Sequence, residues 1–133
     1  MQIMKPALII LKYSYAICRC GNDSSIPKWL DRSDFYSLTR TPDELSIICN
    51  QEVVEPDEDL IIDKNWQIIK VNGPLDLSLI GIIADISLIL KKSKIPVFII
   101  SSYDTDYFLV KEEKLDKAVV SLKNNGYKIL PEK

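Results

Sequence analysis

The pattern of apolar and polar residues in the second half of the chain predicts two helices and four strands. Apolar residues spaced i, i+3, i+4 and i+7 predict an amphipathic helix over 111–125, and an apolar run predicts a helix over 77–90 that is buried nearly all round. Shorter apolar runs predict strands over 67–71, 96–101, 107–110 and 127–130. The resulting order, β-α-β-β-α-β, is the ferredoxin-like arrangement, in which two helices cover one face of an antiparallel sheet.

The first half has the same kind of strand pattern but no long helix, so it is interpreted as an abbreviated relative of the second half. Its predicted elements are one bent strand or two short strands over 8–20, a helical turn over 26–30, and strands over 35–40 and 45–49 that form a hairpin around the turn 41–44.

Residues 51–64 form the compositional break between these halves. They contain six acidic residues and one lysine, which favours a solvated linker over the alternative of a cation site. We therefore expect an α+β protein with two tandem domains, an abbreviated one over 1–62 and a complete one over 63–133.

Composition narrows the function classes. The chain of 133 residues is 47% hydrophobic and 27% charged, and its net charge of −2 predicts no attraction to nucleic acid or to a membrane surface. Three cysteines without a recognisable export signal favour reduced thiols and a cytoplasmic location. The absence of histidine removes the commonest general base and metal ligand, so we expect no enzyme activity, no metal and no cofactor.

Three stretches of the chain stand out as motifs. They are FYSLTRTPDELS at 35–46, VNGPLDLSLIGI at 71–82 and ISSYDTDYFLV at 100–110, the most specific of the three. Together they resemble the tandem ACT-domain proteins of the CASTOR-like group, a family related to the regulatory part of aspartate kinases. The chain departs from the family pattern at Ser102, where threonine is expected, and at Leu77, where phenylalanine is commoner. The resemblance implies paired ACT-like domains with partly exchanged N-terminal segments, an amino acid bound where the domains meet, and a homodimer.

The turn at Asn72-Gly73-Pro74 is the first candidate for ligand chemistry. It leads from a predicted strand into a predicted helix, where free backbone N–H groups and the positive end of the helix dipole suit a carboxylate. Gly73 allows close approach of the backbone, and Ser78 would add a hydroxyl donor. The alternative is an ordinary strand-to-helix turn.

The predicted hairpin turn containing Asp104 and Asp106 is the second candidate. Two neighbouring carboxylates repel each other and are stabilised by a nearby cation, such as the ammonium group of a ligand. The alternatives are a hairpin in which these residues only satisfy backbone donors, and a general acid/base pair, which lacks a third catalytic group.

The leading hypothesis is therefore a regulatory module that binds an amino acid or similar small metabolite between the glycine turn and the acidic turn, which requires that these corners lie close together. The alternatives are an interaction module without a small ligand and an enzyme of ferredoxin-like fold. The predicted ligand-binding residues are Asn72, Gly73, Pro74, Leu75, Ser78, Ser101, Ser102, Asp104, Thr105 and Asp106.

Overall fold

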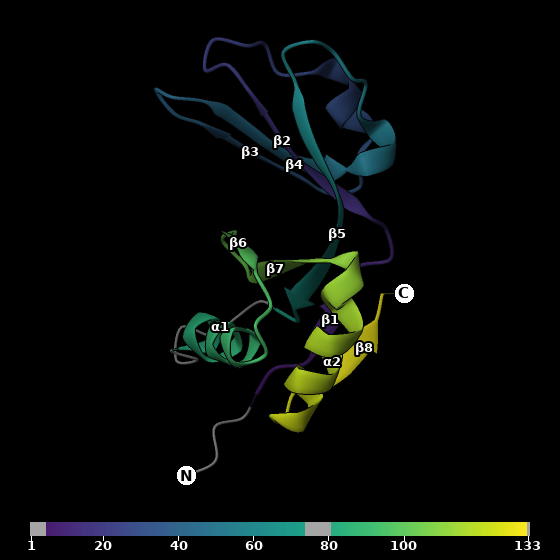
Figure 1. Ribbon diagram of the computed structural model, residues 1–133, viewed down its shortest axis with the longest axis vertical. Helices are drawn as coiled ribbons and strands as arrows, with labels where there is room; N and C mark the ends of the chain where they lie inside the picture. The colour runs from purple at the N-terminus through teal and green to yellow at the C-terminus, as the bar shows by residue number, and fades with distance from the viewer. Residues whose placement is uncertain (1–4, 74–80, 133) are drawn as a thin grey trace. The chain divides into compact units, whose positions relative to one another are not determined.

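The computed structural model describes residues 5–73 and 81–132. The chain divides into two compact units, one formed by residues 13–66 and the other by residues 1–12 together with 67–133. We call these the N-terminal unit and the C-terminal unit (Figure 1). The expected domains, 1–62 and 63–133, differ from these units chiefly because the first twelve residues join the C-terminal unit.

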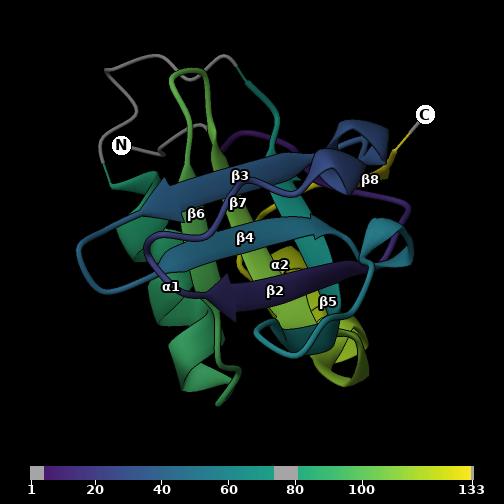
Figure 2. The same ribbon diagram turned by 90° about the horizontal axis from the view of Figure 1, so that it is seen from above.

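The N-terminal unit is a small sheet with two short 3₁₀ helices. Its strands lie in the order β3-β4-β2-β5, and all its strand pairs are antiparallel (Figure 2). The chain order is strand, helical turn, two strands, helical turn and strand, so this unit is a ferredoxin-like motif with minimal helices. Its elements are β2 (Tyr15–Cys20), η1 (Lys28–Arg32), β3 (Tyr36–Arg40), β4 (Leu45–Asn50), η2 (Gln51–Val53) and the first part of β5 (Ile61–Val71).

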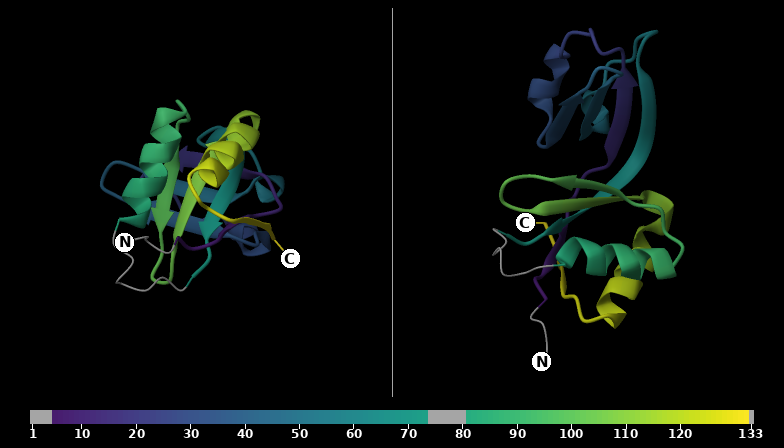
Figure 3. Two further views of the ribbon diagram at one scale, coloured as in Figure 1. Left: turned by 90° about the horizontal axis from the view of Figure 1, so that it is seen from below. Right: turned by 90° about the vertical axis from the view of Figure 1, so that its left-hand side faces the viewer.

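The C-terminal unit repeats that order with full helices. The second part of β5 leads to α1 (Ile82–Lys92), β6 (Phe98–Ser101), β7 (Asp106–Lys111), η3 (Glu112–Lys114), α2 (Leu115–Asn124) and β8 (Ile129–Pro131). Its strand neighbours are β6-β7-β5-β1-β8, where β1 is Leu8–Ile10. Both helices lie on one side of these strands (Figure 3). The predicted ferredoxin-like class is confirmed in both units.

Strand β1 is an additional strand that the simple motif does not contain. It pairs antiparallel with β5, Leu8 opposite Val71, and parallel with β8, Leu8 opposite Ile129. The expected antiparallel sheet therefore contains a parallel pair, because a segment from the start of the chain is inserted between β5 and β8 of the C-terminal unit. Of the two arrangements expected for 8–20, the structure has two separate strands, β1 and β2.

Strand β5 begins earlier than expected. Ile61, Ile62 and Asp63 pair with β2, so the last residues of the predicted linker form a strand and the rest holds η2. The polar composition was misleading because most side chains at the start of β5 are exposed while the backbone still joins the sheet. Cross-strand pairing outweighs local composition here.

Each unit has its own hydrophobic core. In the C-terminal unit, Leu8 from β1 packs with Ile86 of α1, Phe108 of β7 and Leu122 of α2. In the N-terminal unit, Leu30 of η1 packs on the strand residues Ile47 and Cys49.

Helix α1 is less buried than its apolar sequence predicts. Ile86 and Leu90 are fully buried, whereas Ile83 and Leu88 are 38% and 47% exposed. The expectation of burial on nearly all sides is therefore wrong for these two positions, because the helix packs in the core of its unit through Ile82, Ile86, Ile89 and Leu90.

Candidate functional site

The tip of the β6–β7 hairpin is held by hydrogen bonds between its first and last residues. Ser101 and Asp106 form the last strand pair. Beyond it, the backbone N–H of Ser102 donates to the carbonyl of Thr105 at 2.9 Å, and the Ser102 hydroxyl donates to the same carbonyl at 3.1 Å. Ser102 and Asp104 are exposed, so the tip has a fixed backbone and accessible polar side chains.

Thr105 connects this tip to the end of β5. Its side chain is buried, and its hydroxyl donates a hydrogen bond of 2.6 Å to the carbonyl of Val71, the last residue of β5. Asn72 and Gly73 follow directly in the chain. The hairpin tip and the residues before the glycine turn are therefore neighbours, as the leading hypothesis requires.

Asp106 is an unusual residue for its position. It follows the alternation of β7, in which Phe108 and Val110 face the core of the C-terminal unit, and it is only 8% exposed. One carboxylate oxygen accepts a hydrogen bond of 2.6 Å from the Ser101 hydroxyl. A carboxylate is costly to bury without a charge partner, so the arrangement favours a cationic group at this corner.

The backbone N–H of Asn72 was predicted to be free for a ligand, and the structure differs from this prediction. It is not a free donor, because it donates to the carbonyl of Ala7 at 2.9 Å, which continues the ladder between β1 and β5. Asn72 and Gly73 are both exposed. The predicted residues Pro74, Leu75 and Ser78, and the predicted start of the helix at 77, lie outside the described residues.

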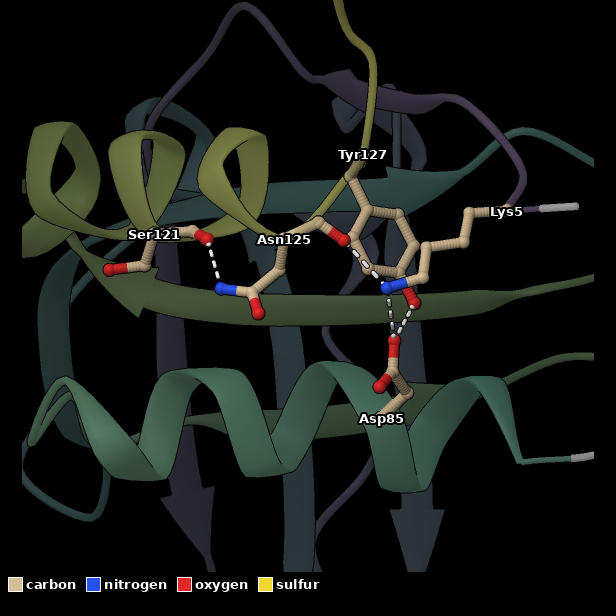
Figure 4. A network of polar contacts seen from close by, with 5 residues as sticks. All are labelled: Lys5, Asp85, Ser121, Asn125 and Tyr127. Atoms are coloured by element: carbon tan, nitrogen blue, oxygen red, sulfur yellow. Dashed lines mark hydrogen bonds and ion pairs between the residues drawn. The ribbon is translucent and has the colours of Figure 1, made fainter. Parts of the chain in front are cut away.

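A second polar cluster lies between the helices of the C-terminal unit and was not predicted (Figure 4). The Lys5 ammonium lies 3.4 Å from Asp85 of α1, donates to the Asn125 carbonyl at 2.6 Å and sits 4.8 Å from the centre of the Tyr127 ring. The Tyr127 hydroxyl donates to the same Asp85 oxygen at 2.5 Å.

Tyr127 is almost fully buried in this cluster. Burial raises the pKa of Tyr127 well above its usual value, and the hydrogen bond to Asp85 and the Asp85 charge act in the same direction. The sequence contained one signal of this cluster, since Asp85 interrupts an otherwise apolar helix and such a residue needs a partner.

Cys18, Cys20 and Cys49 are buried free thiols of the N-terminal unit. The hydrogen bond between Cys18 and Cys49 lowers the pKa of Cys18 and raises that of Cys49. Over 5–73 and 81–132, no group of three or more cysteine, aspartate or glutamate side chains is arranged to hold a metal ion. In the same ranges, no helix has the length and apolar character needed to cross a membrane.

Two family models match the chain. A model of the ACT domain matches residues 61–124, and a model of an N-terminal domain matches residues 13–57. The first covers most of the C-terminal unit, including the β6–β7 hairpin, and the second covers most of the N-terminal unit. No curated protein matches the chain.

The matches with solved structures extend over the residues of both units. A crystal structure of an Agrobacterium tumefaciens protein is 34% identical, with 98% of this chain and 96% of that chain covered and a TM-score of 0.89. Aspartate kinase of Clostridium acetobutylicum is 15% identical, with a TM-score of 0.71 over 93% of this chain and 36% of that chain. The ligand-free regulatory subunit of aspartate kinase from Thermus thermophilus is 12% identical, with a TM-score of 0.59 over 86% of this chain and 93% of that chain. At these identities, the two kinase structures show a shared fold.

Proposed function

Because the chain is an ACT-domain protein that shares its fold with structures of aspartate kinase and of an aspartate kinase regulatory subunit, we propose that it is a regulatory protein that binds an amino acid or a similar zwitterionic metabolite. The proposed site lies in the C-terminal unit, between the β6–β7 hairpin tip and the end of β5. Ligand binding would favour one conformation of the chain over another, and that population shift would be the regulatory output.

The buried carboxylate of Asp106 carries this proposal. Its neighbours in β7 are core residues, and the Ser101 hydroxyl that bonds to it is neutral. A ligand ammonium group beside Asp106 would supply the opposite charge that stabilises a buried carboxylate. Asp104 at the exposed tip adds a second negative charge, and Gly73 leaves the backbone accessible to the rest of the ligand.

The similar proteins support a regulatory role more than a catalytic one. ACT domains are regulatory, and the Thermus thermophilus structure is a regulatory subunit. We therefore propose that the chain is not an enzyme. The three free thiols support the separate proposal that it acts in the cytoplasm.

A thermal-shift screen with each standard amino acid tests the proposal. A ligand at about 100 times its Kd stabilises the folded chain by about 2.7 kcal/mol, which raises Tm by several degrees. The wild type should respond to at least one amino acid and Asp106→Leu to none, whereas the control Asp43→Asn, at the exposed tip of the β3–β4 hairpin, should keep the response. A wild type that responds to no amino acid at millimolar concentration contradicts the proposed function.

The exposed apolar residues of α1 favour a second candidate function, an interaction module without a small ligand. Ile83 and Leu88 are 38% and 47% exposed, and exposed apolar residues can contribute to a protein–protein contact. The predicted homodimer also stays a prediction.

Sedimentation of the wild type and of Leu88→Glu tests the interaction module and the homodimer. A protein that self-associates through α1 should become monomeric in the variant.

A further inference from the structure

The two units contain matching hairpins. In the N-terminal unit, Arg40 and Leu45 form the last strand pair before a four-residue tip. In the C-terminal unit, Ser101 and Asp106 form the last pair before another four-residue tip. Each hairpin follows the first helical element of its unit, so they occupy equivalent places in the two ferredoxin-like motifs.

The two tips are built by the same hydrogen bonds. The N–H of Thr41 donates to the Glu44 carbonyl at 2.9 Å, just as the N–H of Ser102 donates to the Thr105 carbonyl at 2.9 Å. The Thr41 hydroxyl accepts from the Glu44 N–H at 3.1 Å, and the Ser102 hydroxyl accepts from the Thr105 N–H at 3.4 Å. These contacts establish residue-by-residue equivalence between 40–45 and 101–106.

The two hairpins differ in chemistry at the strand pair on either side of the tip. Asp106 corresponds to Leu45, which is buried in the N-terminal core, and Ser101 corresponds to Arg40. The Arg40 guanidinium reaches from the hairpin to the loop that follows β2. There it donates to the carbonyl of Asn22 and, at 2.8 Å, to the carbonyl of Ser24.

Two further side chains join the same hairpin tip to the segment around the end of β2. The Asn22 amide donates to the Pro42 carbonyl at 2.8 Å, and the Arg19 guanidinium donates to the Asp43 carbonyl at 3.2 Å. Three side chains therefore cross between the hairpin and this segment. In the C-terminal unit, the elements in the same places are the β6–β7 tip and the end of β5, where the proposed function puts the ligand.

We propose that the N-terminal unit contains the same corner in a closed form, occupied by the chain's own Arg40, so that each chain binds one amino acid, in the C-terminal unit. This inference rests on the proposed function for the ligand itself. The closure by Arg40 stands on the hydrogen bonds of the N-terminal unit alone.

Hydrogen exchange of the full chain without added ligand tests the closure. Arg40→Ser introduces the residue found at the equivalent position of the other hairpin. Peptides covering 20–26 and 40–46 should exchange about fivefold faster or more in this variant, because local opening no longer breaks the two guanidinium bonds. Arg32→Ser is the matched control, since Arg32 bonds elsewhere in the same unit, to Val53 and Glu55. Equal exchange in Arg40→Ser and wild type overturns the closure.

Calorimetric titration with each standard amino acid tests the number of sites. The wild type should bind one molecule per chain, and that binding should persist in Arg40→Ser. Two equivalent molecules per wild-type chain, or binding lost in Arg40→Ser but kept in Asp106→Leu, overturns the inference. A titration in which no amino acid binds refutes the proposed function and with it the single site, whereas the exchange result still decides whether Arg40 closes the corner.

Discussion

Asp106 and Leu45 occupy equivalent positions at the start of β7 and β4, and both are buried. The fold therefore accepts an apolar side chain at this position. A carboxylate there loses hydration and gains one hydrogen bond from Ser101, which is a cost to stability rather than a gain. Ligand recognition is the reason we propose for its presence.

Replacing Asp106 by leucine should leave the fold intact and stabilise it. We expect the free energy of unfolding, measured with urea, to rise by about 1 kcal/mol because a buried charge is replaced by apolar surface. Ligand response should disappear in the same variant. A loss of more than about 2 kcal/mol would instead show that Asp106 serves the fold.

Thr105 stabilises the fold, in contrast to Asp106, because its hydroxyl donates a hydrogen bond to the carbonyl of Val71 at the end of β5. Thr105→Val should reduce the free energy of unfolding by about 1–3 kcal/mol because the Val71 carbonyl loses its donor. Thr105→Ser keeps the hydroxyl and should lose less. Equal urea midpoints for the two variants would argue against this hydrogen bond.

At this scale the sequence located the hairpin between β6 and β7, because the run Asp104-Thr105-Asp106 is typical of a turn. It did not predict which carboxylate is buried. That depends on the strand register, which places Asp106 in the last strand pair and Asp104 in the exposed tip.

Hydrogen bonds and an ion pair in the cluster around Tyr127 connect several elements of the C-terminal unit. Lys5 contributes from the segment before β1, Asp85 from the first turn of α1 and Asn125 from the end of α2 (Figure 4). The cluster joins the N-terminal segment to both helices. Its residues are far apart in sequence, which is why periodicity located each helix but not their connection.

This cluster predicts a pH dependence at alkaline pH. The folded-state pKa of Tyr127 is raised, so its contribution to stability is present below the unfolded-state pKa of about 10 and falls as pH rises above that value. The difference in unfolding free energy between wild type and Tyr127→Phe should therefore shrink between about pH 9 and pH 11.

Urea unfolding of both proteins across this pH range measures the effect. Ile26→Ala is the control, because Ile26 is exposed and has no ionisable group, and its difference from wild type should stay constant with pH. A Tyr127→Phe difference that does not change with pH would contradict the raised pKa.

Strand β5 contains one residue in an unusual backbone conformation. Asn65 has a positive φ of 68°, close to the register shift between β2 and β5, and its N–H donates to the Gln51 side chain at 2.8 Å. Asparagine tolerates this conformation better than most residues. We expect Asn65→Ala to cost about 1 kcal/mol more than Asn65→Gly in thermal unfolding. Equal costs would show that the backbone relaxes there.

The whole molecule consists of two ferredoxin-like units that share β5, and the start of the chain belongs to the second unit. The sequence predicted the two motifs because each follows local periodicity. It left the place of β1 unpredicted, since the residues that β1 pairs with, in β5 and β8, are distant in sequence. The resemblance to tandem ACT proteins implied such an exchange of N-terminal segments, and the structure shows where β1 goes.

Leu8→Ala tests that assignment. Leu8 is fully buried in the C-terminal core, so its truncation should cost about 2–5 kcal/mol. Exchange protection should fall in α1 and α2 while β2 to β4 keep theirs. Ile26→Ala is the control, because Ile26 is 53% exposed in the N-terminal unit. Protection lost from β2 to β4 instead would contradict the division into units.

The central claim is a zwitterion site at the β6–β7 tip of the C-terminal unit. Amide NMR spectra recorded while each standard amino acid is titrated into the full chain test it most directly. The account predicts saturable shifts for at least one amino acid, concentrated at 71–73 and 101–106, and their loss in Asp106→Leu. Shifts concentrated at 20–25 and 40–45, or spectra unchanged by every amino acid, would contradict it.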